Sequence, residues 1–142
     1  MRPQWKISAG LLAAACALAV SACSSSGSTS TAADTPLQLP AASSFKSGTC
    51  ATIADSVLTI GRFTHDKAKA AKLSVEDRAL LVAEGEKVKS ALASADKPLA
   101  DQMLQMLMSI GFVRIQVGDL YKPELLATVE AERTKLQTMC VA

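Results

Sequence analysis

The sequence predicts an all-α protein: a small up-down-up-down four-helix bundle, clamped by one disulfide and preceded by a disordered tether. From Cys50 onward, apolar residues recur at the three-to-four-residue spacing of amphipathic helices. The four segments with this pattern have similar lengths and short connections, which favours a bundle of antiparallel neighbours. No pair of segments alternates apolar and polar residues as paired strands do. Cys50 and Cys140 mark the beginning of the first segment and the end of the last.

Start and stop signals divide the helical region. Ser74, with Asp77 three residues later, indicates an N-cap and a capping box. Asp96 followed by Pro98 indicates the next start, and Gly118 is a plausible stop for the helix that begins there. The third helix is the most apolar, so we expect it to be the most buried. The predicted helices are residues 49–69, 75–95, 98–117 and 121–139.

The two cysteines of the helical region are expected to form the disulfide. In an up-down-up-down bundle, the start of the first helix and the end of the fourth lie at the same end of the molecule. Cys50 and Cys140 both fall on inward-facing positions, and exported thiols that meet in one core are expected to pair. Two free buried thiols are the alternative. No Cys-x-x-Cys motif indicates a redox function.

The N-terminus carries the features of an export signal. Arg2 and Lys6 precede an apolar run over residues 7–20, which is shorter than the roughly 20 residues that a membrane-spanning helix needs. Val20-Ser21-Ala22-Cys23 then resembles the lipobox of bacterial lipoproteins. The resemblance implies cleavage before Cys23, diacylglycerol attachment to its sulfur and further acylation of the new amine. An ordinary signal peptide, cleaved near Ser21-Ala22 to release a soluble protein, is the alternative.

These features divide the chain into three parts. Residues 1–22 are the predicted signal peptide, residues 23–44 the lipidated cysteine with a flexible tether, and residues 45–142 the helical bundle. The tether is rich in serine, threonine, alanine and proline and lacks an apolar period, so it cannot bury enough surface to fold. We therefore expect a protein held at the cell membrane through the lipid on Cys23, with its domain on the extracytoplasmic side.

The charge balance argues against nucleic-acid binding. Without Arg2 and Lys6, the 15 basic residues of the chain fall to the number of its acidic residues, 13. A nucleic-acid binder keeps a basic face and aromatic stacking residues, and the helical region has neither.

Three charged residues interrupt the predicted apolar faces. Glu84 lies in the stripe of the second helix, Arg114 in that of the third and Arg133 in that of the fourth. An unpaired buried charge is costly, so we expect an internal ion pair of Arg114 with Glu84 or Asp77. A pocket for an anionic ligand at Glu84 and Arg114 is the alternative, and so is simple exposure to water.

Other candidate residues point to structural roles. Met103, Met106 and Met108 could hold Cu(I) or form an adaptable surface, but their spacing favours core filling. His65, the single histidine, lies at the edge of an apolar stripe, and Tyr121 is expected to pack in the last connection. No nucleophile–base pair, metal-ligand spacing or phosphate loop is present, so we expect no catalytic site, no metal and no cofactor.

The sequence therefore predicts a non-catalytic protein-interaction module that binds another protein of the cell envelope. A carrier that holds an apolar, anionic or haem-like ligand between its helices is the alternative. Haem would need axial ligands, for which His65, Tyr121 and the methionines are available.

Overall fold

The computed structural model describes residues 37–142, which are mostly helical and contain no β-strand. Within this range, an isolated antiparallel bridge joins Phe45 to Val141. Two of the 3₁₀ turns follow α3 and α4, and the third precedes α1. The elements in chain order are η1 (Ala42–Ser44), α1 (Thr49–Thr64), α2 (Lys67–Ala71), α3 (Val75–Ser90), η2 (Leu92–Ser94), α4 (Lys97–Ile115), η3 (Gly118–Leu120) and α5 (Pro123–Cys140).

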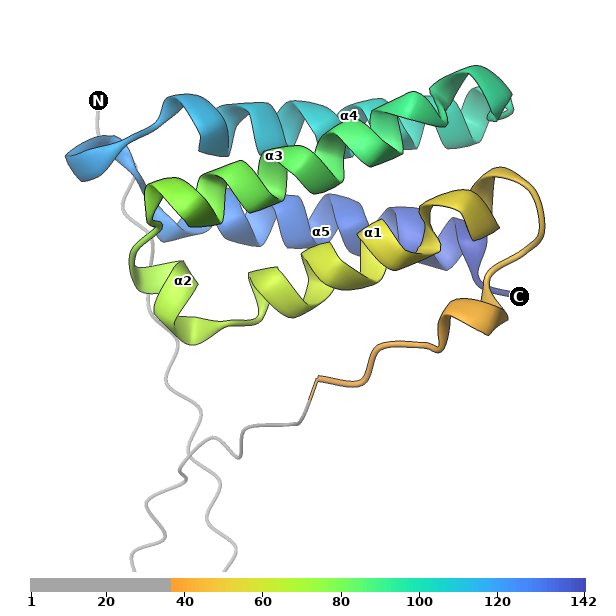
Figure 1. The fold of residues 1–142 in the computed structure, drawn as a ribbon, viewed down its shortest axis with the longest axis horizontal. Coiled ribbons are helices and arrows are strands. Elements are labelled where there is room, and N and C mark those ends of the chain that lie inside the picture. The colour runs from red at the N-terminus through yellow and green to blue at the C-terminus, as the bar shows by residue number, and fades with distance from the viewer. Residues whose placement is uncertain (1–36) are drawn as a thin grey trace, which may run out of the picture. The chain divides into compact units, whose positions relative to one another are not determined.

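The four long helices pack side by side in two layers (Figure 1). Helices α3 and α4 form the upper layer of that view, and α1 and α5 form the lower. Helix α4 packs against α3 and α5, and α1 likewise packs against α3 and α5. The short helix α2 lies at one end, after α1. None of the helices described in residues 37–142 combines the length and apolar character required to cross a bilayer.

The first predicted helix is wrong in extent, because residues 49–69 form two helices. α1 ends at Thr64, and the chain breaks at His65 and Asp66 before α2 begins. Asp66 has an extended backbone, and its side chain accepts a hydrogen bond from the backbone N–H of Ala68. An N-cap that satisfies a free backbone N–H starts a new helix, so the local cap overrides the apolar period that continues through this region.

The start signals of the next two helices are confirmed. Ser74 accepts from the backbone N–H of Asp77, and Asp77 accepts from that of Ser74, which completes the capping box of α3. Asp96 accepts from the backbone N–H of Leu99 at the start of α4. The ends are less well predicted: α3 stops at Ser90 and gives way to a 3₁₀ turn rather than continuing to residue 95.

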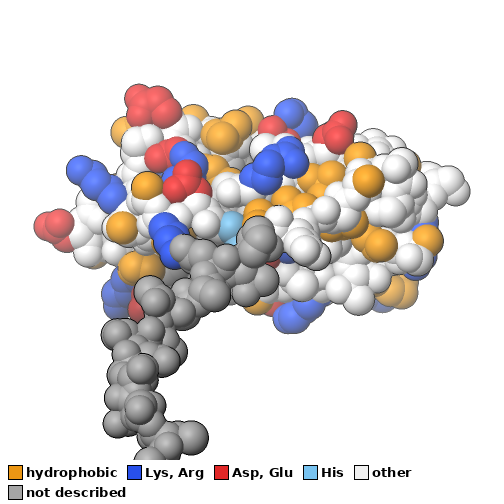
Figure 2. Space-filling view, turned by 90° about the horizontal axis from the view of Figure 1, so that it is seen from below, with side chains coloured by type: hydrophobic (Ala, Val, Ile, Leu, Met, Phe, Trp, Pro, Cys, Tyr) orange, Lys and Arg blue, Asp and Glu red, His pale blue; other side chains and the backbone are white. Residues whose placement is uncertain are grey.

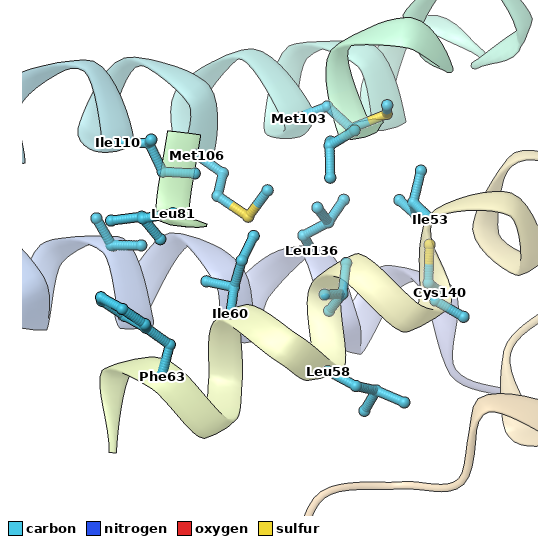
Figure 3. Packing of buried hydrophobic residues seen from close by; sticks show 14 of the residues in the cluster. Ile53, Leu58, Ile60, Phe63, Leu81, Met103, Met106, Ile110, Leu136 and Cys140 are labelled. Atoms are coloured by element: carbon cyan, nitrogen blue, oxygen red, sulfur yellow. The ribbon is translucent and has the colours of Figure 1, made fainter. Parts of the chain in front are cut away.

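The core lies between the four long helices and is formed by aliphatic, methionine and phenylalanine side chains. Met106 of α4 points towards Ile60 of α1, and Met103 lies one turn earlier on α4 (Figure 3). Both methionines are fully buried, so the predicted core filling is confirmed for these two.

The disulfide between Cys50 and Cys140 is confirmed, with the two Cα atoms 5.2 Å apart. It joins the start of α1 to the end of α5 across 90 residues of chain. The same end is reinforced by backbone hydrogen bonds from Lys46 to Cys140 and from Ala142 to Ser44. The first and last parts of the described domain are therefore held together both covalently and by main-chain pairing.

The packed domain begins before residue 45, the boundary predicted from the sequence. Leu39 packs against the core, and its Cδ2 atom would lie 3.0 Å from a Cβ atom built at Gly61. Residues 42–44 form η1. Leu37 and Leu39 stand between two prolines without an apolar period, so the sequence gives no helical signal here and predicts tether. The signal peptide, Cys23 and the rest of the tether lie outside the described residues.

Candidate functional site

The outward face of helix α4 is apolar. The buried face of this helix, with Met103, Met106 and Val113, lies against the core. Leu104, Met108, Phe112 and Ile115 occupy the opposite side of the helix, since each follows the last by three or four residues. Their exposed fractions are 46%, 51%, 55% and 67%. We call this set the outer stripe of α4.

Exposed apolar residues continue beyond the end of the helix. Val117 and Leu120, in the segment that contains η3, are 53% and 66% exposed. No charged residue interrupts the sequence between Asp101 and Arg114. Single exposed apolar side chains are ordinary, whereas a row of large ones on one helix is a candidate binding surface.

The outer stripe corrects the prediction that the third helix is the most buried. The wide apolar stripe of this helix predicts that it is the most buried of the four. In the structure, α4 has packed neighbours in α3 and α5, and its outward side stays exposed. The uncharged stretch 102–113, with large apolar residues on both sides of the helix, was the available signal for this surface.

The predicted ion pair of Arg114 with Glu84 or Asp77 is not present. Arg114 is exposed in the last turn of α4, where its long side chain reaches solvent. It lines a surface hollow between α3 and α4, beside Glu86 and Lys89. A basic residue in the last helical turn interacts favourably with the helix dipole, so this position needs no internal partner.

Glu84 and Asp77 find other partners. Glu84 is buried and accepts a hydrogen bond from the Nζ atom of Lys87, at 2.8 Å on the same helix. Asp77 pairs with Lys69 of α2, and this hydrogen bond lowers the pKa of the Asp77 carboxyl and raises that of the Lys69 ammonium. The structure therefore separates Glu84 from Arg114 and does not bring them together as one anion site.

Arg133 is buried in a polar network of α1 and α5. Its Nε and Nη2 atoms donate to the two carboxylate oxygens of Glu130, at 2.8 and 2.6 Å. The guanidinium also donates to the side chain of Gln137, and Thr64 of α1 donates to Glu130. An internal ion pair does form, but at Arg133 rather than at Arg114.

The electrostatics of this network favour the charged carboxylate. Burial pushes the pKa of Glu130 upward, but hydrogen bonds from Arg133 and Thr64 and the positive charge of Arg133 hold it below its ordinary value. Gly61 makes room for the guanidinium, because a Cβ atom there would lie 3.2 Å from the Arg133 Nε atom. The charged groups of this network are thus bonded to one another, and their role is to stabilise the fold.

The remaining candidates separate into buried and exposed groups. Met108 belongs to the outer stripe, away from buried Met103 and Met106. Tyr121 packs against the core, and its hydroxyl donates to the carbonyl oxygen of Lys69 at 3.2 Å. His65 lines a surface pocket of about 460 Å³ with Glu130 and Leu126. In the part of the chain that the structure describes, no three His, Cys, Asp or Glu residues gather as metal ligands.

Surface charge is mixed. Figure 2 shows acidic and basic side chains interspersed over the face in view, without a continuous basic area. Several are paired with each other, such as Lys89 with Glu86 and Lys135 with Glu132. This face offers no counterpart to a phosphate backbone.

Comparison with known proteins returned no match: no family model matches this chain, and no curated protein or solved structure does so either.

Proposed function

We propose that this protein is a lipid-anchored, non-catalytic interaction module of a bacterial cell envelope. The lipobox-like residues that end at Cys23 support an anchor in the cell membrane, with the helical domain on the extracytoplasmic side. We further propose that the four long helices run up-down-up-down, as their short connections favour.

The outer stripe of α4 is the observation that carries the proposed interaction. Leu104, Met108, Phe112 and Ile115 are all exposed on one side of one helix. Burying a large apolar side chain contributes roughly 1.5–3 kcal/mol, so a partner that covers this stripe gains binding free energy from it. Aromatic and methionine side chains are also enriched at the centres of protein interfaces.

The buried charges support a role without catalysis. Glu130 is held by Arg133 and Thr64, and Glu84 by Lys87. Groups engaged in this way are not poised to transfer a proton to a substrate.

The anchor is tested by replacing Cys23. In the native host, the full chain is expected in the membrane fraction, and Cys23→Ser is expected to lose both lipid labelling and membrane retention. A Ser21→Ala variant keeps a small residue before the cysteine and serves as the control. Equal labelling and retention of the Cys23→Ser chain would overturn the anchor.

The interaction is tested by photo-crosslinking from the stripe. A benzophenone amino acid replaces Phe112 in the full chain, and irradiated cells are expected to show an adduct of the size of a protein. The same group at Asp55, which is exposed on α1, is the matched control and is expected to give no such adduct. An adduct with lipid alone, or none, would contradict the proposal.

A small-molecule carrier is the second candidate, and the pocket beside His65 favours it. Its volume of about 460 Å³ falls in the range of ligand sites, and Leu126 and Ala127 give it an apolar wall. A native mass spectrum of the chain from its own host tests this function. Extra mass that is lost in Ala127→Trp would support a carrier, and a bare acylated chain would count against it.

A further inference from the structure

A second surface pocket lies at the end of the domain that carries α2 (Figure 1). Its volume of about 480 Å³ falls in the range of small-molecule sites. Lys72 and Leu73 follow α2, Arg78 lies on α3, and Asp119 and Tyr121 lie in the connection between α4 and α5. This pocket shares no residue with the outer stripe or with the pocket of the second candidate function.

Arg78 is the group of this pocket that lacks hydrogen-bond partners. Its side chain is half-buried, and its Nε atom is enclosed without a partner among residues 37–142. Within the same residues the guanidinium forms no ion pair, and it lies over Tyr121 with Cζ 5.9 Å from the ring centre. Arg133 is by contrast hydrogen-bonded at all three nitrogens. A buried donor without a partner is uncommon in folded proteins and often marks the place of an ion or a water.

The accessible part of Arg78 is the end of its guanidinium. Because Nε is enclosed, the two Nη atoms are the donors that a molecule in the pocket can reach. A guanidinium presents its N–H groups in a planar fork that matches the two oxygens of a carboxylate. The geometry therefore fits an oxyanion that faces Arg78 from the pocket.

The charges of the pocket fit a ligand with one negative charge. Lys72 is exposed, and like Arg78 it forms no ion pair within the part of the chain that the structure describes. Asp119 also lines the pocket and pairs with neither of them there. These three side chains sum to one positive charge, which a single carboxylate balances. A doubly charged phosphate would be repelled more strongly by Asp119.

We propose that this pocket binds a small organic carboxylate, with its oxygens at the Nη atoms of Arg78 and its apolar part against Leu73 and Tyr121. Leu73 is buried, and Tyr121 packs against the core. The Tyr121 hydroxyl donates to the carbonyl oxygens of Lys69 and Ala70, at 3.2 and 3.4 Å, so the ring is held in place before a ligand arrives. This binding function is independent of the interaction proposed for the outer stripe.

Benzoate is the probe for this site, because it combines one carboxylate with a flat apolar ring. It is titrated into the isotope-labelled full chain in detergent micelles, and the NMR signals of the Arg78 Nε–H group and the Gly118 amide are followed. Both signals belong to residues that line the pocket and are expected to shift along one saturating curve. Benzamide has nearly the same shape without the charge and is expected to leave them unchanged. Equal responses to both compounds, or no response to benzoate, would overturn the proposal.

Three variants locate the site through the Gly118 amide. Arg78→Lys keeps the charge but loses the fork, and it is expected to bind benzoate about tenfold more weakly, as for the loss of one charge-assisted hydrogen bond. Asp119→Asn removes the repulsion and is expected to bind about two- to fivefold more tightly. Arg62→Lys, at an exposed arginine of α1, is the matched control and should bind as the parent chain does.

These variants can each contradict the proposal. Unchanged affinity in Arg78→Lys would show that the guanidinium does not hold the ligand, and weaker binding in Asp119→Asn would show that the charge balance is wrong. Asp119 is exposed, so its variant gives an answer even if thermal unfolding shows that Arg78→Lys is unfolded. Inorganic phosphate tests the class of ligand: if it displaces benzoate at a concentration below the Kd of benzoate, the assignment to a carboxylate fails.

Discussion

Arg133 can be buried because the residues that bond its guanidinium lie on the same helix, α5. Glu130 is one turn earlier and Gln137 one turn later on the same helix, and both bond the guanidinium. The inward position of Arg133 follows from the apolar period of the sequence. The identity of its partner does not follow from this period, because Glu130 lies at the edge of the apolar stripe, where an acidic residue is normally exposed to solvent. Only the placement of Thr64 on a neighbouring helix completes the network.

Replacing Glu130 by glutamine is expected to destabilise the fold. The change leaves the buried guanidinium of Arg133 without its counter-charge, and breaking a buried pair in this way costs on the order of 3 kcal/mol. Urea unfolding of the purified chain at pH 7 measures the loss. Glu86→Gln is the control, because its pair with Lys89 is exposed on both sides and is expected to matter by less than about 0.5 kcal/mol.

The same carboxylate predicts a pH dependence. The folded pKa of Glu130 lies below its ordinary value of 4.5, so its contribution to stability is present above pH 4.5 and is lost as the pH falls through the folded pKa. The free energy of unfolding is therefore expected to decrease between pH 5 and pH 3. Glu130→Gln removes the titrating group and should show a smaller decrease, and an unchanged slope would contradict this account.

Gly61→Ala is expected to destabilise the protein by about 1–3 kcal/mol, the usual range for overpacking. The new methyl group would lie 3.0 Å from Leu39 Cδ2 and 3.3 Å from Arg133 Cζ, so these side chains must shift. Gly111→Ala is the control, because it meets open space and is expected to stabilise by about 1 kcal/mol through helix propensity. The two melting temperatures should therefore move in opposite directions from that of the parent chain.

At the scale of elements, helix starts are predictable where a side chain satisfies the first backbone N–H groups. Ser74 and Asp96 mark the beginnings of α3 and α4 both in the sequence and in the structure. The break after Thr64 was missed because its cap, Asp66, lies within a segment whose apolar period continues. Here an N-cap signal competes with a continuing apolar period, and the packing of the domain decides between them. A single sequence does not reveal that packing.

Ser74→Ala is expected to lower the free energy of unfolding by about 1 kcal/mol, the usual cost of losing an N-cap. The variant removes the oxygen that accepts from Asp77 N–H, at 3.0 Å, and half of the capping box. Thermal unfolding measures the effect. Ser74→Asp keeps an acceptor at this position and should retain most of the stability, so an equal loss in both variants would show that the cap is not the cause.

The sequence of α4 shows that both sides of the helix are apolar, but it does not show which side stays exposed. Leu104 and Phe112 have the same apolar character as Met103 and Ile110, and the helical wheel does not say which face receives a neighbour. In the structure, α3 and α5 pack against α4 on the inner side. The exposure of the outer stripe is therefore a property of the assembled domain.

At the scale of the whole molecule, the disulfide was predictable because topology constrains the ends of a bundle. Cys50 and Cys140 are distant in sequence but lie on inward positions of the first and last helices. Any arrangement that returns the last helix to the start of the first brings the two thiols together. The backbone pairing of Lys46 with Cys140 and of Ala142 with Ser44 was not predictable, because it involves no side-chain pattern.

Reduction of this disulfide is expected to lower the free energy of unfolding by about 4 kcal/mol, the chain-entropy estimate for a loop of this size. Urea unfolding of the purified chain with and without dithiothreitol isolates the covalent link, because both sulfur atoms stay in the core. Cys50→Ala with Cys140→Ala should lose somewhat more, since it also removes packing at two buried positions. A loss below about 1 kcal/mol on reduction would mean that the non-covalent contacts at this end already hold the termini together in the unfolded ensemble.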